Sequence, residues 1–293
     1  MLFDEATLRK LNTLTLVATQ VRAGMLQGDR RSTKRGTSIE FADYRDYVPG
    51  DDLRRLDWNV YARLEKPFIK LFEEEEDLAV HILVDGSRSM DWGEEDTNKY
   101  DFARKLAGAL GSIALSTGDR LTVSQLTDSG TGASYGPARG NFHTLRLFNF
   151  LETCKSGGET YINRALRQYA LTHRRAGLTF LLTDLLDPHG YESGFSDLLS
   201  RGHELVVLHL LAPEEADPAL AGDLKLIDVE YGAEQEVSLD SGLRRLYVER
   251  VQAWQGEIRA WCRQRNIHYL NVTTNTPWDK VVLQQFRAQN LVK

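Results

Sequence analysis

The sequence has few cysteines and no long apolar stretch. Its two cysteines, Cys154 and Cys262, have no CxxC spacing, so neither a disulfide framework nor a thiolate metal site is indicated. The longest apolar stretches, LTFLLTDLL and ELVVLHLLA, are far shorter than the roughly 18 residues of a membrane helix. The amino terminus, MLFDEATLRK, carries acidic residues where a signal peptide would be basic. These absences predict a cytoplasmic protein without membrane insertion, whose cysteines are core thiols.

Several catalytic signatures are also missing. The seven histidines show no HExxH or similar spacing, and the sequence contains neither a GxSxG elbow nor a Walker A motif. A zinc hydrolase is therefore unsupported, and any ATP hydrolysis belongs to a partner, while composition alone leaves a Ser/His/Asp triad open. The segment GTGASYG lacks the full dinucleotide fingerprint and is expected to form a hairpin or a loop.

The composition that is present is that of a globular protein. With 293 residues, 42% hydrophobic and 27% charged, the chain can form one large domain or one domain with an appendage. The net charge of -6 disfavours a general nucleic-acid binder. One basic stretch, from Arg30 to Arg35, forms either a solvated loop or a docking patch for an acidic partner.

Residues 1–75 differ in pattern from the rest of the chain. From about residue 6 to 23, apolar residues recur at three- and four-residue spacing, which predicts an amphipathic helix. The following segment IEFADYRDYVPGDDLRRLDWNVYAR is rich in aromatic and charged residues and is expected to be irregular but packed. We predict that this N-terminal extension folds against the main domain, residues 76–293, and does not form a separate domain.

After residue 67 strand-like and helix-like patterns alternate. The strand-like segments are residues 67–72, 78–84, 120–126, 178–184, 204–211 and 267–272. The helix-like segments are residues 99–115, 144–154, 162–175, 243–264 and 277–289. Several strands are continuous apolar runs, which is typical of strands buried on both faces. The pattern therefore predicts an α/β fold with a doubly wound, mostly parallel sheet and helices on both faces.

Hydroxyl and carboxylate side chains follow two of these strands. Asp85, Ser87 and Ser89 come directly after residues 78–84 in HILVDGSRSM, and Asp184 closes the segment 178–184. Thr160 follows a Gly-Gly turn immediately before a predicted helix. Ligand sites in open α/β sheets lie beyond the carboxyl ends of the strands, where the strand order reverses. We therefore expect these five side chains to converge on one point.

Oxygen ligands without His or Cys suit Mg²⁺ or another divalent cation. Because most of the set are neutral hydroxyls, a bound divalent ion would keep excess positive charge and an open, water-filled position. A carboxylate from a protein partner could complete such a site. Each residue also has a structural alternative: Ser89 could cap a turn, Thr160 could cap the following helix, and Asp184 could accept bonds from loop backbone.

The same aspartates could instead serve a magnesium-dependent, phosphatase-like hydrolase. A phosphatase of the haloacid dehalogenase type needs a second carboxylate two residues after its nucleophile, whereas Ser87 stands two residues after Asp85. We therefore expect no catalytic residue and a protein that is not an enzyme. The absence of any His, Lys or third carboxylate near the metal would favour adhesion over hydrolysis.

Two segments carry a resemblance to known families. DGSRSM resembles the DxSxS motif of von Willebrand factor type A domains, over roughly residues 76–293. The resemblance implies a metal-ion-dependent adhesion site in which Thr160 and Asp184 supply the threonine and the second aspartate. Upstream, EFADYRDYVPGDDLRRLDWNVYAR is similar to the signature that precedes this domain in the bacterial family called domain of unknown function fifty-eight. Members of that family resemble partners of MoxR-type AAA+ ATPases, which implies an adaptor or co-chaperone role.

Overall fold

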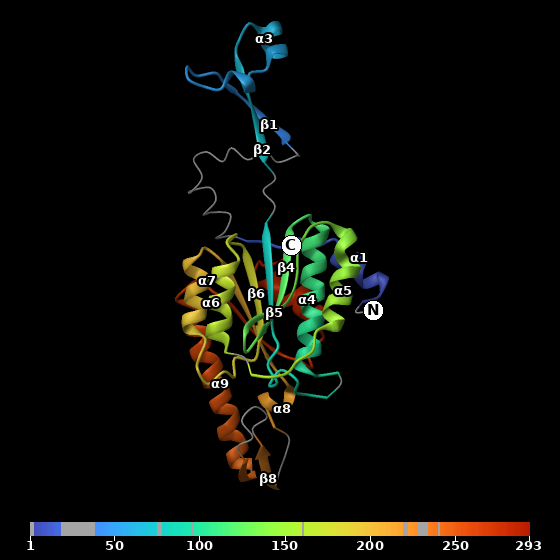
Figure 1. Cartoon of the computed structure of the whole chain (residues 1–293), viewed down its shortest axis with the longest axis vertical. Coiled ribbons are helices and arrows are strands. Elements are labelled where there is room, and N and C mark those ends of the chain that lie inside the picture. Colours follow the sequence, from blue (N-terminus) through green and yellow to red (C-terminus); the bar gives the residue numbers. More distant parts are fainter. Residues whose placement is uncertain are drawn as a thin grey trace. The chain divides into compact units, whose positions relative to one another are not determined.

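The computed structural model describes most of the chain (Figure 1): residues 3–18, 39–74, 78–94, 96–159, 161–218, 222–227, 234–239 and 241–293. The chain forms two compact units, which are the main unit, residues 1–26 with 78–293, and the small unit, residues 27–77. The packing of residues 1–75 against the main domain stays a prediction. The basic stretch from Arg30 to Arg35 lies outside the described residues.

A six-stranded sheet forms the centre of the main unit, with the strand order β10-β7-β6-β3-β4-β5. Its strands are β3 (Ala79–Asp85), β4 (Arg120–Thr127), β5 (Gly130–Ala138), β6 (Leu178–Thr183), β7 (Glu204–Leu211) and β10 (His268–Thr273). All neighbouring pairs are parallel except β4 and β5, which form a hairpin, one of the two structures expected for GTGASYG. Because β4 and β6 lie on opposite sides of β3, the strand order reverses at β3.

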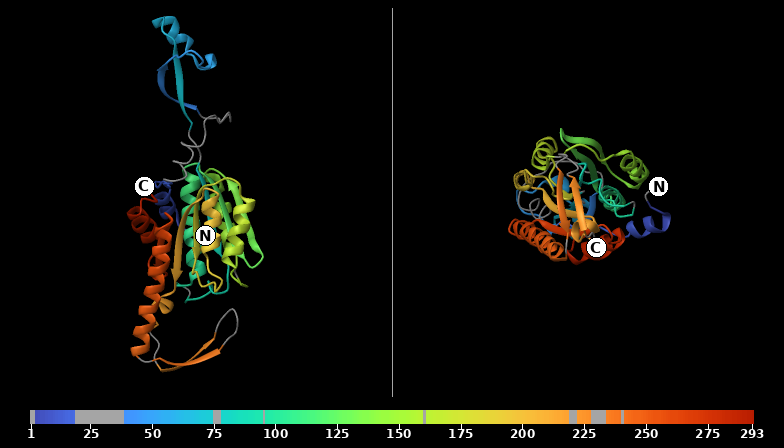
Figure 2. Two further views of the ribbon diagram at one scale, coloured as in Figure 1. Left: turned by 90° about the vertical axis from the view of Figure 1, so that its left-hand side faces the viewer. Right: turned by 90° about the horizontal axis from the view of Figure 1, so that it is seen from below.

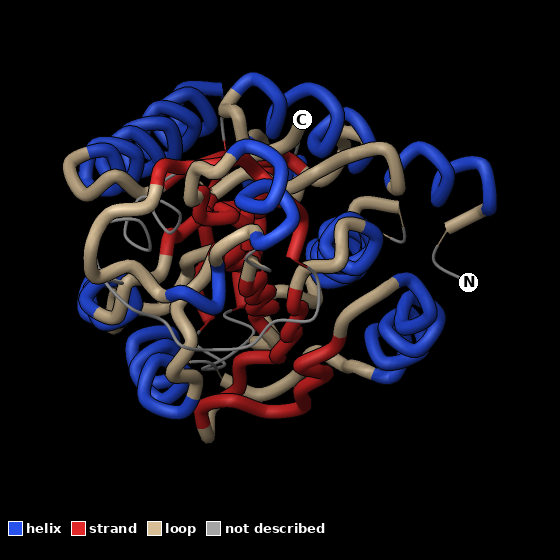
Figure 3. Tube along the Cα trace, turned by 90° about the horizontal axis from the view of Figure 1, so that it is seen from above, coloured by secondary structure: helices blue, strands red, loops and turns tan. Residues whose placement is uncertain are grey.

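Helices cover both faces of this sheet, as Figure 3 shows. One face packs against α1 (Glu5–Leu11), α4 (Lys99–Ser116) and α5 (Thr144–Thr153). The carboxyl-terminal helical segment packs against the same face, and it consists of α10 (Trp278–Lys280), a π-helical turn (Val281–Gln285) and α11 (Phe286–Ala288). The other face packs against α6 (Ile162–Thr172), α7 (Glu192–Ser200) and α9 (Ser241–Arg263). Alternate side chains of one strand enter opposite cores, since Ile82 and Val84 belong to the first and Leu83 to the second. The predicted doubly wound α/β fold is confirmed.

The small unit is more regular than its sequence indicated. It pairs β1 (Ile39–Asp46) antiparallel with β2 (Phe68–Glu74), and between them lie a 3-10 turn (Leu53–Arg55) and α3 (Trp58–Leu64). The expectation of an irregular segment was wrong because Asp57 starts a helix. Its Oδ1 accepts hydrogen bonds from the backbone N–H groups of Asn59 (2.9 Å) and Val60 (3.2 Å), which satisfies donors that a helix start leaves unpaired.

The first helix is shorter than the predicted span of residues 6–23, of which residues 19–23 lie outside the described residues. Helix α1 ends at Leu11, and the chain then pairs with its own carboxyl terminus, since Leu16 forms an antiparallel bridge with Val292. Leu14, Leu16 and Ala18 are buried, which is the two-residue alternation of an extended segment. The helical interpretation failed because these apolar positions fit both periods, and the pairing partner lies at the other end of the sequence.

The long helix α9 has two different halves. Its only buried residues, Ile258 and Cys262, lie in the carboxyl-terminal half. The amino-terminal half follows the hairpin of β8 (Gly222–Ile227) and β9 (Glu234–Leu239) and extends beyond the edge of the sheet that carries α8 (Pro213–Ala216), as Figures 1 and 2 show. Among the described parts of the chain, no helix has the length and apolar character needed to cross a membrane.

Candidate metal site

Two aspartates lie side by side at the carboxyl edge of the sheet. Asp85 is the last residue of β3, and Asp184 directly follows β6, which pairs with β3 in parallel. The helices that follow these strands, α4 and α7, cover opposite faces of the sheet. The aspartates therefore flank the crevice at the reversal of strand order, which is where doubly wound sheets bind ligands.

Asp85 is buried and is held only by neutral donors among the contacts that the structure describes. Its Oδ1 accepts a hydrogen bond from the Ser87 backbone N–H (2.9 Å), and its Oδ2 accepts one from the Thr183 hydroxyl (2.7 Å). Burial and, to a smaller extent, the charge of Asp184 raise the pKa of Asp85 to about 6, although these hydrogen bonds oppose the shift. A raised pKa means that the negative charge of Asp85 is under-compensated, which favours a bound cation.

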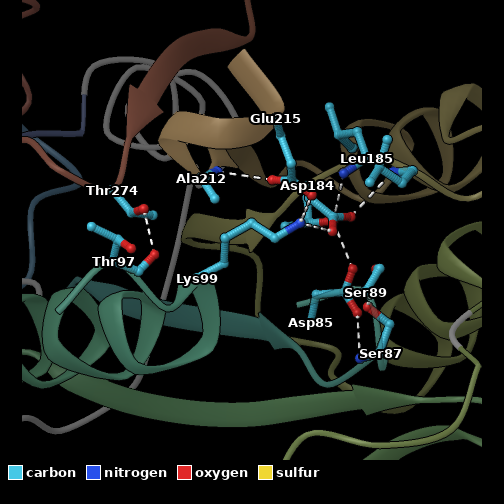
Figure 4. Close-up of polar contacts among 12 residues, drawn as sticks. Asp85, Ser87, Ser89, Thr97, Lys99, Asp184, Leu185, Ala212, Glu215 and Thr274 are labelled. Carbon is cyan, nitrogen blue, oxygen red and sulfur yellow. Dashed lines mark hydrogen bonds and ion pairs between the residues drawn. The ribbon is translucent and has the colours of Figure 1, made fainter. Parts of the chain in front are cut away.

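The two serines of the DGSRS segment lie beside Asp85 and close to each other (Figure 4). Their Oγ atoms are 3.0 Å apart. Oxygen ligands at about 2.1 Å from an octahedral Mg²⁺ ion lie about 3 Å from their neighbours, so the spacing fits two ligands of one ion. The glycine between Asp85 and Ser87 is required, because a Cβ atom at Gly86 would lie 2.8 Å from the Leu126 carbonyl oxygen.

The loop that precedes α6 is fastened to the same segment. The Arg88 N–H donates to the Gly158 carbonyl (2.8 Å), and the Gly157 N–H donates to the Gly86 carbonyl (2.8 Å). Thr160 itself lies outside the described residues, so its predicted role as a ligand stays a prediction. Helix α6 begins at Ile162, whose backbone N–H donates to Asp187 Oδ2 (2.7 Å) from the loop after β6.

Asp184 is held by a buried lysine that the sequence analysis did not identify. Lys99 Nζ lies 2.7 Å from Asp184 Oδ2 and 2.7 Å from Glu215 Oε1, and the lysine side chain is completely buried (Figure 4). Asp184 Oδ1 also accepts a hydrogen bond from the Leu186 backbone N–H (3.1 Å). This is the bond to loop backbone that the sequence analysis offered as the alternative role of Asp184. Lys99 and Glu215 were missed because a charged residue at a helix start normally faces water. No local sequence pattern predicts an ion pair between residues so far apart in the sequence.

The charges of this network shift the pKa values of Lys99 and Glu215. Burial lowers the pKa of Lys99, but the charges of Asp184 and Glu215 outweigh it and leave the pKa above its ordinary value. Burial raises the pKa of Glu215, and the Lys99 ammonium opposes this shift. Lys99 is therefore a permanent positive charge at neutral pH.

The residues present fit a divalent cation. Asp85, Asp184 and Glu215 contribute three negative charges and Lys99 one positive charge, so the ionised group carries a net charge of -2. Within the described ranges no three His, Cys, Asp or Glu side chains form a metal-binding cluster, so a cation here would depend on the serine hydroxyls as well. This mixture of hydroxyl and carboxylate oxygens suits Mg²⁺.

Comparisons with known proteins identify the family. A family model described as "Protein of unknown function DUF58" matches residues 43–257. "Uncharacterized protein Rv1480" of Mycobacterium tuberculosis is 29% identical over 272 residues, which cover 92% of this chain and 85% of that protein. The crystal structure of the conserved hypothetical protein BatB from Bacteroides thetaiotaomicron is similar with a TM-score of 0.41 and 14% identity, over 73% of this chain and 99% of that one. A von Willebrand factor type A structure from Catenulispora acidiphila has a TM-score of 0.35 and 16% identity, over 49% of this chain and 35% of that one. Because the family model matches well over half of its length, the chain belongs to the family described as protein of unknown function DUF58.

Proposed function

We propose that this protein is a metal-ion-dependent protein-interaction module. The observation that carries the proposal is the convergence of Asp85, Ser87, Ser89 and Asp184 at the reversal of strand order. Mg²⁺, when bound there, supplies a positive centre with an open coordination position. The carboxylates of Asp85 and Asp184 and the hydroxyls of Ser87 and Ser89 would hold the ion, and a partner's Asp or Glu side chain would complete its coordination.

The surroundings of the site suit contact with another protein. Two large apolar side chains are exposed close to the candidate ligands: Trp92 (46% exposed) in the loop after Ser89, and Leu186 (45% exposed) two residues after Asp184. Exposed aromatic and aliphatic side chains beside a polar centre are typical of protein interfaces. The family resemblance supports a MoxR-type AAA+ ATPase as this partner, with the present chain as an adaptor or co-chaperone.

The alternative of a magnesium-dependent hydrolase needs an acid or base at the site. We expected that the absence of any His, Lys or third carboxylate near the metal would favour adhesion. This condition is not met, because Lys99 contacts Asp184 and Glu215 contacts Lys99. However, Lys99 is fully buried between two carboxylates, and both Glu215 oxygens are occupied, by Lys99 and by the Ala212 N–H (2.8 Å). Neither group is placed to exchange a proton with a substrate, which supports adhesion over hydrolysis.

The experiment compares binding of the purified ATPase partner to wild type and to Asp85→Ala, each with Mg²⁺ and with chelator. We expect binding only by the wild type in Mg²⁺, because Asp85→Ala removes a charged ligand while leaving the sheet core intact. Asp197→Ala, a substitution of the half-exposed aspartate on α7, is the matched control and should bind like the wild type. Equal binding by wild type and Asp85→Ala in both conditions would exclude the metal site as the docking surface, and hydrolysis of a phosphate ester lost in Asp85→Ala would establish the alternative.

A further inference from the structure

The ion-pair network of Lys99, Asp184 and Glu215 joins three separate connections of the sheet. Lys99 is the first residue of α4 and follows the loop that carries the serines, and its backbone N–H donates to the Trp92 carbonyl (2.9 Å). Asp184 follows β6, and Glu215 lies on α8 after β7. One ammonium group thus lies 2.7 Å from a carboxylate on each of the two connections that follow the neighbouring strands β6 and β7.

The two aspartates of the site are held in different ways. Both Asp85 oxygens accept hydrogen bonds from neutral donors, whereas Asp184 Oδ2 is bound by the Lys99 cation. A fully buried ammonium is stabilised only by good geometry with its partners, so its position defines theirs. The Glu215 carboxylate is in turn anchored at the other end, where its Oε2 accepts the Ala212 N–H. The lysine is therefore placed between an anchored carboxylate and the candidate ligand.

We propose that Lys99 is a positioning residue, which holds Asp184 in the orientation that the metal requires. The inference rests on the proposed metal site and adds a residue that does not itself touch the cation. Groups that hold a metal ligand from behind typically change metal affinity by about 10- to 100-fold when they are removed. Lys99 differs from the usual hydrogen-bonding supports because it also sets the charge of the site.

Orientation and charge balance make opposite predictions for two variants. The double substitution Lys99→Met with Glu215→Gln keeps the net charge at -2, because it removes one positive and one negative charge. It nevertheless leaves Asp184 without its cation. Glu215→Gln alone changes the net charge to -1 but leaves Lys99 bound to Asp184. If Lys99 orients Asp184, the double variant binds metal more weakly than Glu215→Gln, and if Lys99 only balances charge, the order is reversed.

The test is calorimetric titration of the full chain with Mg²⁺ and with Ca²⁺, for wild type and both variants, after circular dichroism has shown that each is folded. We expect the double variant to lose about tenfold or more in Mg²⁺ affinity and less in Ca²⁺ affinity, because Mg²⁺ demands near-ideal octahedral geometry and Ca²⁺ tolerates irregular sites. Glu215→Gln should lose about threefold or less. A general loss of structure would lower both affinities alike.

The outcomes separate this inference from the proposed function. A wild type that binds neither cation would overturn the metal site and, with it, the role of Lys99. A wild type that binds Mg²⁺ while the double variant binds equally well would overturn the inference alone. If the double variant does not fold, Glu215→Gln still decides, since a loss of about tenfold or more in this variant would contradict the orienting role.

Discussion

Acid should destabilise this protein in part through His81, a buried histidine on β3. The His81 Nδ1 atom lies 2.7 Å from the Tyr169 hydroxyl, and its Nε2 atom lies 3.1 Å from the Arg175 carbonyl oxygen. Burial, together with the smaller effects of the nearby His203, His173 and Arg175 side chains, lowers the pKa of His81 to about 3, although the bond to the Arg175 carbonyl opposes the shift. The neutral imidazole is therefore the form that the folded protein accommodates.

The size of the effect follows from the two pKa values. The unfolded chain, with a histidine pKa of about 6.5, takes up the proton before the folded protein does, so stability is complete above that pH and falls as the pH approaches 3. At pH 5 the loss is about 2 kcal/mol. His81→Gln removes this proton but also the imidazole contact with His203, whose ring centroid is 5.0 Å away. We expect the variant to be about 1 kcal/mol less stable at pH 7.5 and at least as stable as the wild type at pH 5.

Urea unfolding at pH 5, 6, 7 and 8 measures this difference, with an unchanged dependence on urea showing that both proteins unfold in the same way. The matched control is His143→Gln, a substitution of a half-buried histidine on a 3-10 turn (Asn141–His143). The free energy of unfolding should fall less steeply toward acid in His81→Gln only. Parallel curves for wild type and His81→Gln would refute the assignment of the acid sensitivity to His81.

Three further predictions concern the core and the site. Asp187→Ala should lower the free energy of unfolding by about 1 to 2 kcal/mol, because Asp187 accepts the first backbone N–H of α6, and Asp187→Asn should recover most of the loss in urea titrations. Burial raises the pKa of Cys154 above its ordinary value and that of Cys262 to about 12, so a thiol reagent at pH 8 should modify neither in the native protein and both in urea; rapid native labelling would contradict this. Gly86→Ala should weaken Mg²⁺ binding in calorimetry, since the added methyl group meets the Leu126 carbonyl, and unchanged binding would mean that the loop can shift without loss.

The sequence indicated the fold and one half of the site because both depend on local patterns. Apolar runs followed by polar residues identified the ends of β3 and β6, and Asp85, Ser87 and Ser89 lie within five residues of one another. Neighbouring strand ends of a doubly wound sheet meet at one edge, so the pairing with Asp184 followed from topology.

The other half of the site depends on contacts that no local pattern records. Thr183 was part of an apolar strand pattern, yet its hydroxyl donates to Asp85 across the gap between two strands. Lys99 is the first residue of an amphipathic helix, a position where charged side chains are normally solvated. It can be buried because two carboxylates from connections distant in the sequence, Asp184 and Glu215, pair with it. Similarly, the first helix was predicted too long because the strand-like partner of Leu16 is Val292.

The long sequence separations in the charge network also determine when it can form during synthesis. The hydrogen bond from Thr183 to Asp85 spans 98 residues, and the contacts of Lys99 with Asp184 and Glu215 span 85 and 116 residues. A nascent chain that has exposed only β3, α4 and β4 contains Asp85 and both serines but lacks every carboxylate partner of Lys99. The lysine must remain hydrated until β6 and β7 have emerged and docked, and such distant pairings form slowly. Burial of Lys99 therefore marks a late step of folding, and ribosome-bound fragments that end before and after residue 215 would separate the two stages.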